Sequence, residues 1–460
     1  FCPTFIKPSC TENNSPVPIN GIKSFFLNLT NSLLYTAHNI ATIPPNMNLI
    51  QPNLNGGASS SPTLIDIGFP DQSIESRNAK MIPFLSGFIL FSELVDKMVI
   101  RKNMYFIFQI INVYLNKYRN KRGIFTEMNK IVTFGEILLR LTTLNKERFS
   151  QSKNFEITYA GSECNVAVSL SHFNEETYFI TSVPDNPIGQ ACINHVRQFG
   201  VNTDYMVKSG DRLAVYYLEN GASMRASNIV YDRKESSFSK ATPNLFDWDS
   251  IFKDCNLFHF SGITPSLSES AKNLTKIALS EASKRNIMIS CDLNYRSNLW
   301  TPEEAQETMI PLMEKVDILI GGKKDPEIML GEKTINEEQS SYEKLIESMA
   351  KKYNFKQVAI SLRDSISADH NDWSGIFYSD GKVFKSKKYE IQIVDRVGAG
   401  DAFSAGLIYG IFNQLTNQET LDFAIAASAL AHTFHGDFNL STIEEIQAVS
   451  SGDISGRIRR

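Results

Sequence analysis

The chain has 460 residues, more than the roughly 250 to 300 at which a single hydrophobic core usually stops growing. Hydrophobic residues make up 42% of it and charged residues 21%, as in an ordinary globular protein. The formal net charge of −4 provides no attraction for nucleic acid or for an anionic membrane, so we expect neither as a partner.

Residues 1–127 differ in composition from the rest of the chain. They are rich in Asn, Ser and Pro, and their apolar patches keep neither period 2 nor period 3.6 for long. Met128 then directly precedes a strand-like run. We therefore predict that residues 1–127 are an N-terminal extension of unknown function, poorly ordered or not native to the domain that follows. The alternative is a signal-like or membrane-surface helix at residues 104–115, which have basic flanks.

The six cysteines lie at long, irregular spacings without a C-x-x-C pair. This pattern predicts neither a zinc site nor a disulfide framework. No uninterrupted apolar run reaches the about 18 residues that a membrane-spanning helix needs. We expect reduced thiols and a cytoplasmic location.

From residue 128 onward, strand and helix signals alternate regularly. Short apolar runs predict buried strands at residues 131–134, 177–181, 257–260, 287–291, 318–320 and 358–361. Helical patterns fall at residues 164–172, 188–199, 268–285, 302–315 and 342–352. This alternation predicts an α/β domain over residues 128–460, with a mostly parallel sheet that is covered on both faces and binds ligands at the carboxyl ends of its strands.

One region interrupts the alternation. Residues 213–219 and 227–231 have the pattern of adjacent strands, with Asn220-Gly221 as a hairpin turn signal and no helix between them. A hairpin inserted in an α/β domain predicts a lid, which we place at about residues 211–233.

The segment from Asp395 to Gly406 carries the strongest chemical signal. Gly398 and Gly400 follow a strand-like run and precede an apolar helix, so the first backbone N–H groups of that helix are free to bind an anion. Asp401 stands beside this anion site and can take a proton from an attacking hydroxyl, as phosphoryl transfer requires. The alternative is that Asp401 only caps the helix.

Other phosphate-binding signatures are missing from the sequence. It contains no G-x-x-x-x-G-K-[ST] motif, and the glycines at 398 and 400 do not continue as G-x-G-x-x-G. The sequence therefore indicates neither a P-loop nor a dinucleotide-binding fold.

Two motifs resemble the signatures of the ribokinase (PfkB-type) carbohydrate kinases. They are Gly398-Ala-Gly-Asp401 with the following Ala-Phe-Ser-Ala-Gly406, and Tyr159-Ala-Gly-Ser-Glu-Cys-Asn-Val-Ala167. Within that family, Phe260-Ser-Gly-Ile-Thr-Pro265 and Cys291-Asp-Leu-Asn-Tyr-Arg-Ser-Asn-Leu-Trp300 are similar to the 2-keto-3-deoxygluconate kinases. The resemblance extends from about Met128 to the C-terminus.

The resemblance implies a ribokinase-like three-layer α/β/α sandwich with a small β-sheet lid. It also implies ATP and Mg²⁺ as cofactors and the phosphorylation of a small sugar acid at its terminal hydroxyl. Asp401 would be the general base. The implied substrate-binding residues are Gly161, Asn165, Tyr216, Tyr231, Arg233, Arg296 and Asp437. The implied nucleotide-binding residues are Asn294, Ser361, Gly398, Ala399 and Gly400.

Elementary chemistry agrees with an acidic substrate, because an arginine fork such as that of Arg233 or Arg296 can pair with a carboxylate through two parallel hydrogen bonds. The metal element departs from the family pattern. Gly322 stands where Asn is usual and Asp325 where Glu is usual. Asp325 would hold the metal through water.

Two alternatives therefore remain beside a 2-keto-3-deoxygluconate kinase. One is a kinase of the same fold acting on a neutral sugar such as fructose or ribose. The other is a degenerate kinase that acts as a sugar-binding regulator, which the altered metal element suggests. The family also suggests a homo-oligomer that forms through the lid, since an exposed hairpin edge favours strand pairing.

Overall fold

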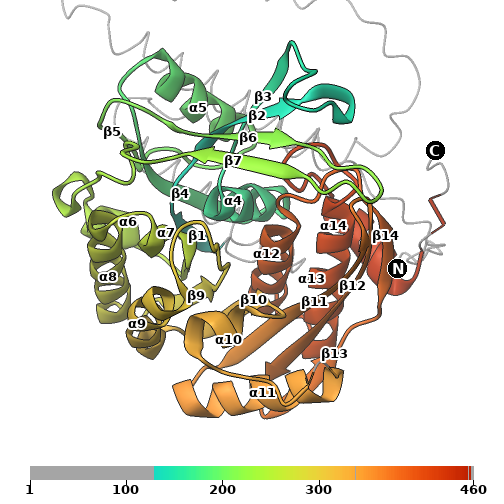
Figure 1. The fold of residues 1–460 in the computed structure, drawn as a ribbon. Helices are drawn as coiled ribbons and strands as arrows, with labels where there is room; N and C mark the ends of the chain where they lie inside the picture. Colours follow the sequence, from blue (N-terminus) through green and yellow to red (C-terminus); the bar gives the residue numbers. More distant parts are fainter. Residues whose placement is uncertain (1–128, 337, 454, 457–460) are drawn as a thin grey trace, which may run out of the picture. The chain divides into compact units, whose positions relative to one another are not determined.

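The structure is a computed structural model that describes residues 129–336, 338–453 and 455–456. The predicted N-terminal extension and its alternative as a membrane-surface helix lie outside the described residues. Within the described part, none of the helices combines the length and the apolar character that crossing a bilayer requires. Two β-sheets and the helices around them make up the domain (Figure 1).

The larger sheet has ten strands in the described chain. Nine follow the order β13-β12-β11-β10-β9-β8-β1-β4-β5, and β14 pairs with β12. The strands from β11 to β5 are parallel, whereas β12 runs antiparallel to each of its neighbours. Their bounds are Lys130–Phe134 (β1), Glu176–Val183 (β4), Met206–Lys208 (β5), Leu257–Ser261 (β8), Met288–Asp292 (β9), Ile318–Gly322 (β10), Gln357–Ser367 (β11), His370–Ser379 (β12), Lys382–Lys385 (β13) and Tyr389–Gln392 (β14).

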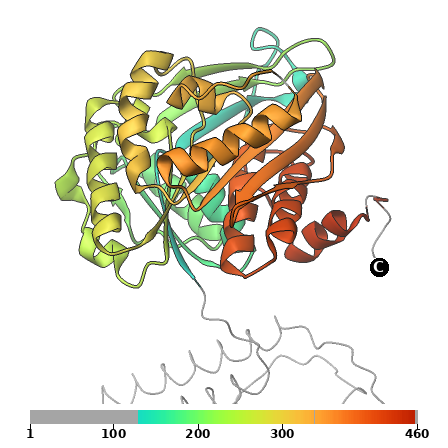
Figure 2. The ribbon, with the colours of Figure 1, turned by 90° about the horizontal axis from the view of Figure 1, so that it is seen from below.

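Helices cover both faces of this sheet, because its central strands are apolar on both sides. Ile131 belongs to one buried cluster and its neighbour Val132 to another. The helices with the Val132 cluster are α8 (Glu269–Lys284), α9 (Pro302–Leu312), α10 (Asp325–Leu330) and α11 (Gln339–Tyr353). Those with the Ile131 cluster are α4 (Ser162–His172), α12 (Ala399–Phe412), α13 (Asn417–Ala431) and α14 (Ile443–Ser451). Figure 2 shows the strands between these two groups of helices.

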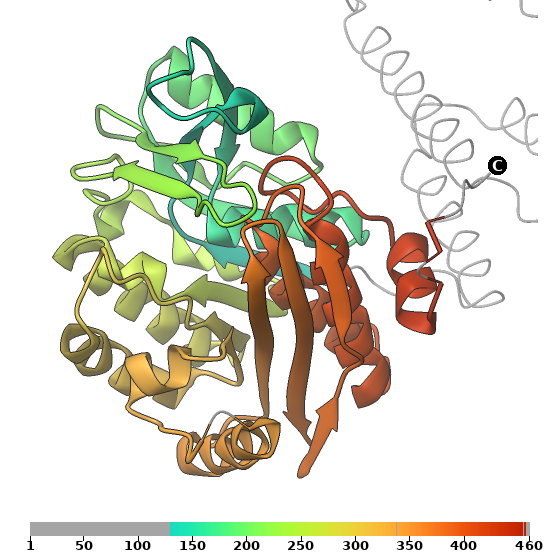
Figure 3. The same cartoon turned by 45° about the vertical axis from the view of Figure 1, so that its right-hand side comes forward.

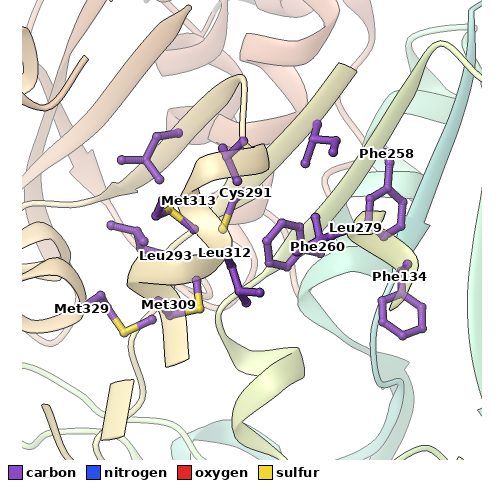
Figure 4. Close-up of a cluster of buried hydrophobic side chains, with 14 of the residues drawn as sticks. Phe134, Phe258, Phe260, Leu279, Cys291, Leu293, Met309, Leu312, Met313 and Met329 are labelled. Atoms are coloured by element: carbon purple, nitrogen blue, oxygen red, sulfur yellow. The ribbon is translucent and has the colours of Figure 1, made fainter. Parts of the chain in front are cut away.

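The cluster around Val132 joins side chains from the sheet and from the helices that cover it. Figure 4 shows Phe134, Phe258 and Phe260 from the strands, and Met309 and Met329 from α9 and α10, as parts of this cluster. All five side chains are at most 1% exposed. Smaller elements complete the domain: α5 (Pro187–Gln198), α6 (Trp248–Phe252), α7 (Ile263–Ser266) and the 3-10 turns Leu144–Lys146, Pro243–Leu245 and Met313–Lys315.

The second sheet is the lid, which lies above the larger sheet in Figure 1 and is seen from another side in Figure 3. Its order is β3-β2-β6-β7, with bounds Leu138–Thr143 (β2), Phe155–Ala160 (β3), Ala214–Glu219 (β6) and Asn228–Asp232 (β7). The predicted pair of lid strands is present as β6 and β7, which are antiparallel. The predicted sandwich of three layers with a lid is confirmed.

The prediction missed the other half of the lid, β2 and β3. In β2 the usual alternation is inverted, because Arg140 and Thr142 are buried while Leu139 and Leu141 are partly exposed. An apolar side chain that faces outward and an arginine that faces inward conceal the period of a half-buried strand. The lid therefore contains a buried charge that the hydrophobic pattern did not reveal.

Several boundaries also differ from the prediction, three of them in an informative way. The connection between β6 and β7 spans residues 220–227 rather than a tight turn at Asn220-Gly221. The helix predicted to reach residue 315 ends at Leu312 and continues as a 3-10 turn. Strand β11 extends past Ser361 to Ser367, because pairing with β12 supplies partners for its backbone.

Candidate active site

Polar side chains gather where three parallel strands end. Strands β8, β9 and β10 end at Ser261, Asp292 and Gly322, and α12 begins close to them, since Ser404 of α12 donates to Asp292 at 3.2 Å. In open α/β sheets, ligands bind outside the carboxyl ends of the strands. The predicted location of the site at this edge therefore agrees with the fold.

The N-terminus of α12 is shaped to receive an anion. Gly398 is its N-cap with φ +87°, and no side chain caps the helix. A Cβ at Gly398 would lie 1.9 Å from the backbone oxygen of Asp437, so only glycine fits there. A Cβ at Gly400 would meet nothing within 4 Å, which leaves open space beside the first N–H groups of the helix, including that of Ala399.

Asp401 lies in the first turn of α12, and its carboxylate is bound by two side chains from the start of α4. Ser162 donates its hydroxyl to Oδ1 at 2.6 Å, and the Asn165 side-chain amide donates to Oδ2 at 2.6 Å. Asn294, which follows β9, donates to the Ser162 hydroxyl at 2.9 Å. The structure thus brings together three of the predicted site residues: Asn165 contacts Asp401 directly, and Asn294 is linked to it through Ser162, which the sequence prediction did not include.

These contacts bear on the alternative that Asp401 only caps α12. Its two carboxylate oxygens accept from α4 side chains rather than from the backbone of α12. Burial raises the pKa of Asp401 to about 7, although the hydrogen bonds from Ser162 and Asn165 and the charge of Arg296 act in the opposite direction. A carboxylate with a pKa near neutrality is suited to exchange a proton at physiological pH.

The start of α4 approaches the lid strands closely. Gly161 is the N-cap of α4, and a Cβ there would lie 2.2 Å from the backbone oxygen of Glu136. The Gly161 N–H donates to the Asn165 side-chain oxygen at 3.3 Å. Glycine at this position therefore lets the chain before β2 pack onto the turn that carries Asn165.

Two further carboxylates, those of Asp292 and Asp325, lie at the end of β9 and just after β10. Burial, together with the negative charges of Asp325 and Asp401, raises the pKa of Asp292 to about 8. Arg296, an exposed side chain after β9, lowers the pKa of all three carboxyl groups. Asp292 was not among the predicted site residues, although its position at the end of a buried parallel strand was a usable signal.

Asp325 begins α10 and accepts a hydrogen bond from the Gly322 N–H at 2.7 Å. Burial raises its pKa, against this hydrogen bond and the charge of Arg296. Gly322 and Asp325 therefore form one local unit, in which the backbone of Gly322 orients the carboxylate. Ser361 lies beside it, since β11 pairs residue 361 with Gly322 and the Ser361 hydroxyl points to the Gly321 oxygen at 3.5 Å.

Two further arginines approach this end of the sheet, and the sequence prediction missed both. Arg363 lies on β11, and its pKa is lowered by burial and by the charges of Arg396 and Arg296, while Asp325 raises it. Arg396 donates to the backbone oxygens of Ser367 and Ala368 at 3.4 and 2.8 Å. The ends of β9, β10 and β11 therefore carry a concentration of positive charge beside the carboxylates.

The lid contributes aromatic and charged side chains on its inner side. Tyr216 and Tyr231 are direct neighbours across β6 and β7, with ring centroids 5.8 Å apart. Arg233 lies over the Tyr231 ring at 5.3 Å and pairs with Glu136, whose carboxylate accepts from Nε at 2.9 Å and from Nη2 at 2.8 Å. Glu136 was another residue that the sequence prediction missed.

Asp437 connects the lid to the loop after α13. The Tyr216 hydroxyl donates to its two carboxylate oxygens at 2.8 and 2.9 Å. Arg140 of β2 donates to Asp437 at 2.6 Å and also to Asp395. The structure thus joins the predicted residues Tyr216 and Asp437 through direct contact, and adds Arg140 and Asp395, which were not among the predicted site residues.

Among residues 129–336, 338–453 and 455–456, no three His, Cys, Asp or Glu side chains are arranged to hold a metal ion by themselves. The carboxylate of Asp325 lies close enough to Asp292 for its negative charge to raise the pKa of Asp292. Mg²⁺ is usually bound through one or two carboxylates together with waters and substrate phosphates. The pair therefore fits a metal that arrives with a phosphate ligand better than a metal held by the protein alone.

Residues 128–443 match the family model described as pfkB family carbohydrate kinase. A 2-dehydro-3-deoxygalactonokinase of Haloferax volcanii is 30% identical over 328 residues, which are 71% of this chain and 98% of the relative. A 2-dehydro-3-deoxygluconokinase of Thermoproteus tenax is 26% identical over 314 residues, which are 67% of this chain and 90% of the relative.

Among solved structures, a 2-dehydro-3-deoxygluconokinase of Thermotoga maritima is similar with a TM-score of 0.70 and 47% sequence identity. The match covers 70% of this chain and 100% of the Thermotoga maritima chain. These similarities confirm the resemblance and the fold class that the sequence predicted.

The raised pKa of Asp292 predicts how stability depends on pH. A carboxyl group whose folded pKa lies above its ordinary value stabilises the fold fully below the ordinary value, near pH 4, and this contribution is lost as the pH rises through the folded value of about 8. In Asp292→Asn the contribution no longer varies with pH. We expect the variant to gain stability relative to the unsubstituted protein by up to about 1.4 kcal/mol per pH unit between about pH 5 and 8.

Denaturant unfolding of both proteins across this pH range measures the effect. The exposed Asp211, changed to Asn, is the matched control, and its unfolding free energy should run parallel to that of the unsubstituted protein. Parallel curves for Asp292→Asn as well would show that Asp292 is ionised in the folded state throughout, and the prediction would be wrong.

Proposed function

The chain belongs to the pfkB family of carbohydrate kinases and is a sugar kinase, and from this premise we propose that it transfers the γ-phosphate of ATP to the terminal hydroxyl of 2-keto-3-deoxygluconate. This substrate is the 2-dehydro-3-deoxygluconate named in two of the relatives. The observation that carries the proposal is the buried Asp401 beside the uncapped N-terminus of α12. A base and an anion site in direct contact are what phosphoryl transfer to a hydroxyl requires.

In the proposed reaction, Asp401 takes the proton of the sugar hydroxyl as its oxygen attacks the γ-phosphorus. The pKa of about 7 makes the carboxylate a usable base at neutral pH. Ser162 and Asn165 fix its orientation through their hydrogen bonds. Because both partners lie at the start of α4, next to Gly161, the same turn can position the base and contact sugar hydroxyls.

The anion hole in this proposal is the turn formed by Gly398, Ala399 and Gly400. Its N–H groups meet the negative charge on the transferred phosphoryl group, and the positive end of the helix dipole adds to that attraction. The open space beside Gly400 allows a phosphate to approach the backbone. These donors are fixed before the reaction begins, so they need no reorganisation as charge develops.

ATP and Mg²⁺ are the proposed cofactors. Mg²⁺ would be held through Asp325 and Asp292 together with water and phosphate oxygens, and it would neutralise charge on the β- and γ-phosphates. Arg363 and Arg396 supply positive charge on the same side, which favours a polyanion such as a triphosphate. Asn294 and Ser361 are proposed nucleotide contacts because they flank this end of the sheet.

The acidic class of substrate is supported by Arg233 and Arg296. The guanidinium of Arg233 uses Nε and Nη2 for Glu136, so among the described residues its Nη1 remains available for a ligand carboxylate. Arg296 is exposed at the edge of the site, close enough to affect the pKa of Asp401. We propose that these two arginines, with Tyr216, Tyr231 and Asp437 on the lid side, select a sugar acid over a neutral sugar.

Turnover of a substrate panel tests this function. With ATP and Mg²⁺, we expect phosphorylation of 2-keto-3-deoxygluconate at a kcat/KM at least about tenfold above that for gluconate, fructose or ribose, because a lost charged contact costs about 1.4 kcal/mol or more. Asp401→Asn should lower kcat by about 100-fold or more, since positioned base catalysis contributes about that factor. A coupled assay for ADP release, with mass spectrometry of the product, measures both.

The exposed Asp211→Asn variant controls for the loss of one carboxylate. Efficient turnover of fructose or ribose and none of the keto acid would instead indicate the neutral-sugar kinase. Sugar binding without turnover of any substrate would indicate the degenerate kinase. That alternative is suggested by Gly322, which stands in the metal element where the family usually has Asn. Full activity of Asp401→Asn would remove Asp401 from the base role.

The pKa of Asp401 also predicts the pH dependence of kcat. Since the base must be ionised, kcat should fall as the pH drops below about 7. The Ser162 hydrogen bond lowers the pKa of Asp401, so Ser162→Ala should move the acidic limb to higher pH. Initial rates from about pH 5 to 9, compared with Ser270→Ala on the distant helix α8, check this. An acidic limb that does not move in Ser162→Ala would contradict the assignment.

We further propose that two copies of the chain pair through their lids. The outer face of the lid carries one continuous row of apolar side chains, Ile157, Leu141, Tyr217 and Val230, given by the register of its strands. Ile157 is 62% and Val230 53% exposed. A contiguous apolar face on a sheet with open edges favours a second sheet of the same kind as its cover.

Light scattering after gel filtration measures the oligomeric state. We expect a dimer for the unsubstituted chain and a monomer for Ile157→Asp with Val230→Asp, because a buried unpaired carboxylate disfavours association. Ile335→Asp, at a side chain that is 86% exposed away from the lid, is the matched control and should remain a dimer. A monomeric unsubstituted chain would contradict the proposal.

A further inference from the structure

Arg140 is a buried charge in the middle of lid strand β2. Its side chain is 2% exposed, and all three arms of its guanidinium donate hydrogen bonds. Nε donates to the Thr142 hydroxyl at 2.7 Å, Nη1 to Asp437 at 2.6 Å, and Nη2 to Asp395. Arginines are rarely buried unless their donors are used in this way. The lid therefore reaches into the domain with one fully engaged side chain.

Both carboxylates that Arg140 binds belong to the loops that frame the N-terminus of α12. Asp395 lies three residues before Gly398, and it accepts from the Val397 N–H at 3.2 Å and from the Gly436 N–H at 3.3 Å. The backbone oxygen of Asp437 lies against Gly398, where a Cβ would be 1.9 Å away. Asp395 therefore holds the backbone at Val397, and Asp437 holds the loop that packs against Gly398, on either side of the proposed anion hole.

Arg140 neutralises negative charge on Asp395 and Asp437. One guanidinium serves two carboxylates that are 2% and 3% exposed. Burial raises the pKa of Asp437, the charge of Arg140 lowers it, and that of Asp395 raises it. Without the arginine, the two negative loops would repel each other in a place with little water to screen them. Arg140 is thus what allows the two loops to approach.

We propose that Arg140 is a positioning residue that couples the lid to the anion hole: when the lid is in place, its guanidinium draws the 395–398 and 435–438 loops together and so aligns the first N–H groups of α12 for phosphoryl transfer. The inference rests on the proposed kinase function. It assigns Arg140 no contact with the sugar or the nucleotide, since the side chain is only 2% exposed and each of its three nitrogens already donates to Thr142, Asp437 or Asp395.

The coupling gives the lid a role in the reaction beyond contact with the sugar. Arg140 of β2 and Tyr216 of β6 are direct partners in the lid sheet, and both donate to Asp437. Tyr231, a proposed sugar contact, pairs with Tyr216 on the next strand. Sugar that binds to the lid therefore stabilises the arrangement in which Arg140 aligns the anion hole. Part of the sugar's binding energy is then used to stabilise the transition state.

The fork geometry of arginine matters for this role. Nη1 and Nη2 of one planar group reach two separate carboxylates, whereas a lysine ammonium is a single point of charge. Arg140→Lys keeps the charge and should lose one of the two contacts. Arg140→Ala removes the charge and the fork and leaves a space that free guanidinium can enter.

The experiment compares steady-state kinetics and amide hydrogen exchange in the unsubstituted protein, Arg140→Lys and Arg140→Ala. We expect kcat to fall about 10-fold or more in Arg140→Lys and about 100-fold in Arg140→Ala, within the range for losing aligned oxyanion donors, with KM for ATP changing by less than about threefold. Exchange should accelerate in the peptide that contains residues 395–401, and much less in the distant helix α8. Guanidinium ion at concentrations too low to unfold the protein should restore part of the kcat of Arg140→Ala.

Arg212→Met is the matched control, because Arg212 is an arginine next to the lid whose ion pair with Asp232 is solvent-exposed. Its kcat and its exchange in residues 395–401 should equal those of the unsubstituted protein. If Arg140→Ala does not fold, Arg140→Lys alone decides the question, and Asp395→Asn provides a second folded variant with the same expected loss of kcat and faster exchange.

The inference is overturned if folded Arg140→Lys keeps its kcat and the exchange of residues 395–401 is unchanged. It is also overturned if stability falls while kcat per folded molecule stays constant, since that is the behaviour of a purely structural contact. Failure of the kinase proposal looks different. In that case the unsubstituted protein phosphorylates no sugar, while the exchange measurement still reports whether Arg140 holds the anion hole.

Discussion

The site depends on one physical constraint, which is that the N-terminus of α12 has no side-chain cap and opens onto the space beside the exposed Gly400. Gly398 adopts a left-handed φ of +87°, and the backbone oxygen of Asp437 packs where any side chain would stand. The helix N–H groups then face the open space beside Gly400. Since no side chain caps these N–H groups, the turn can accept an anion. Asp401, the proposed base, lies in the first turn of the same helix.

The second feature is that the carboxylates of the site are held mainly by neutral donors. Asp401 accepts from Ser162 and Asn165, and Asp292 from Ser404. Burial therefore raises the pKa of Asp401 to about 7 and of Asp292 to about 8, since hydrogen bonds offset only part of the lost hydration. A fixed cation in direct contact would have lowered both values. Such carboxylates can exchange protons or receive a metal with its phosphate, as a kinase needs.

The lid is joined to this centre by polar contacts as well as by apolar packing, since Val397 packs against the buried cluster of lid residues that includes Leu138 and Tyr216. Tyr216 and Arg140 reach down from adjacent strands to Asp437, while Arg233 pairs with Glu136. The family similarity establishes a sugar kinase, and these contacts supply the proposal for how its lid acts.

The sequence alone determined the parallel sheet, its covering helices, the glycine turn at Gly398 that we propose as the anion site and the candidate base Asp401, because each depends on a local pattern of apolar periodicity, glycine and a neighbouring acid. Only the tertiary structure revealed Arg140, which binds a carboxylate 297 residues away, and Asp292, whose raised pKa comes from burial and from Asp325 and Asp401. Ion pairs between segments far apart in the sequence produce no periodic sequence pattern from which they could be predicted. In β2 the buried Arg140 even inverted the hydrophobic alternation that would have identified the strand.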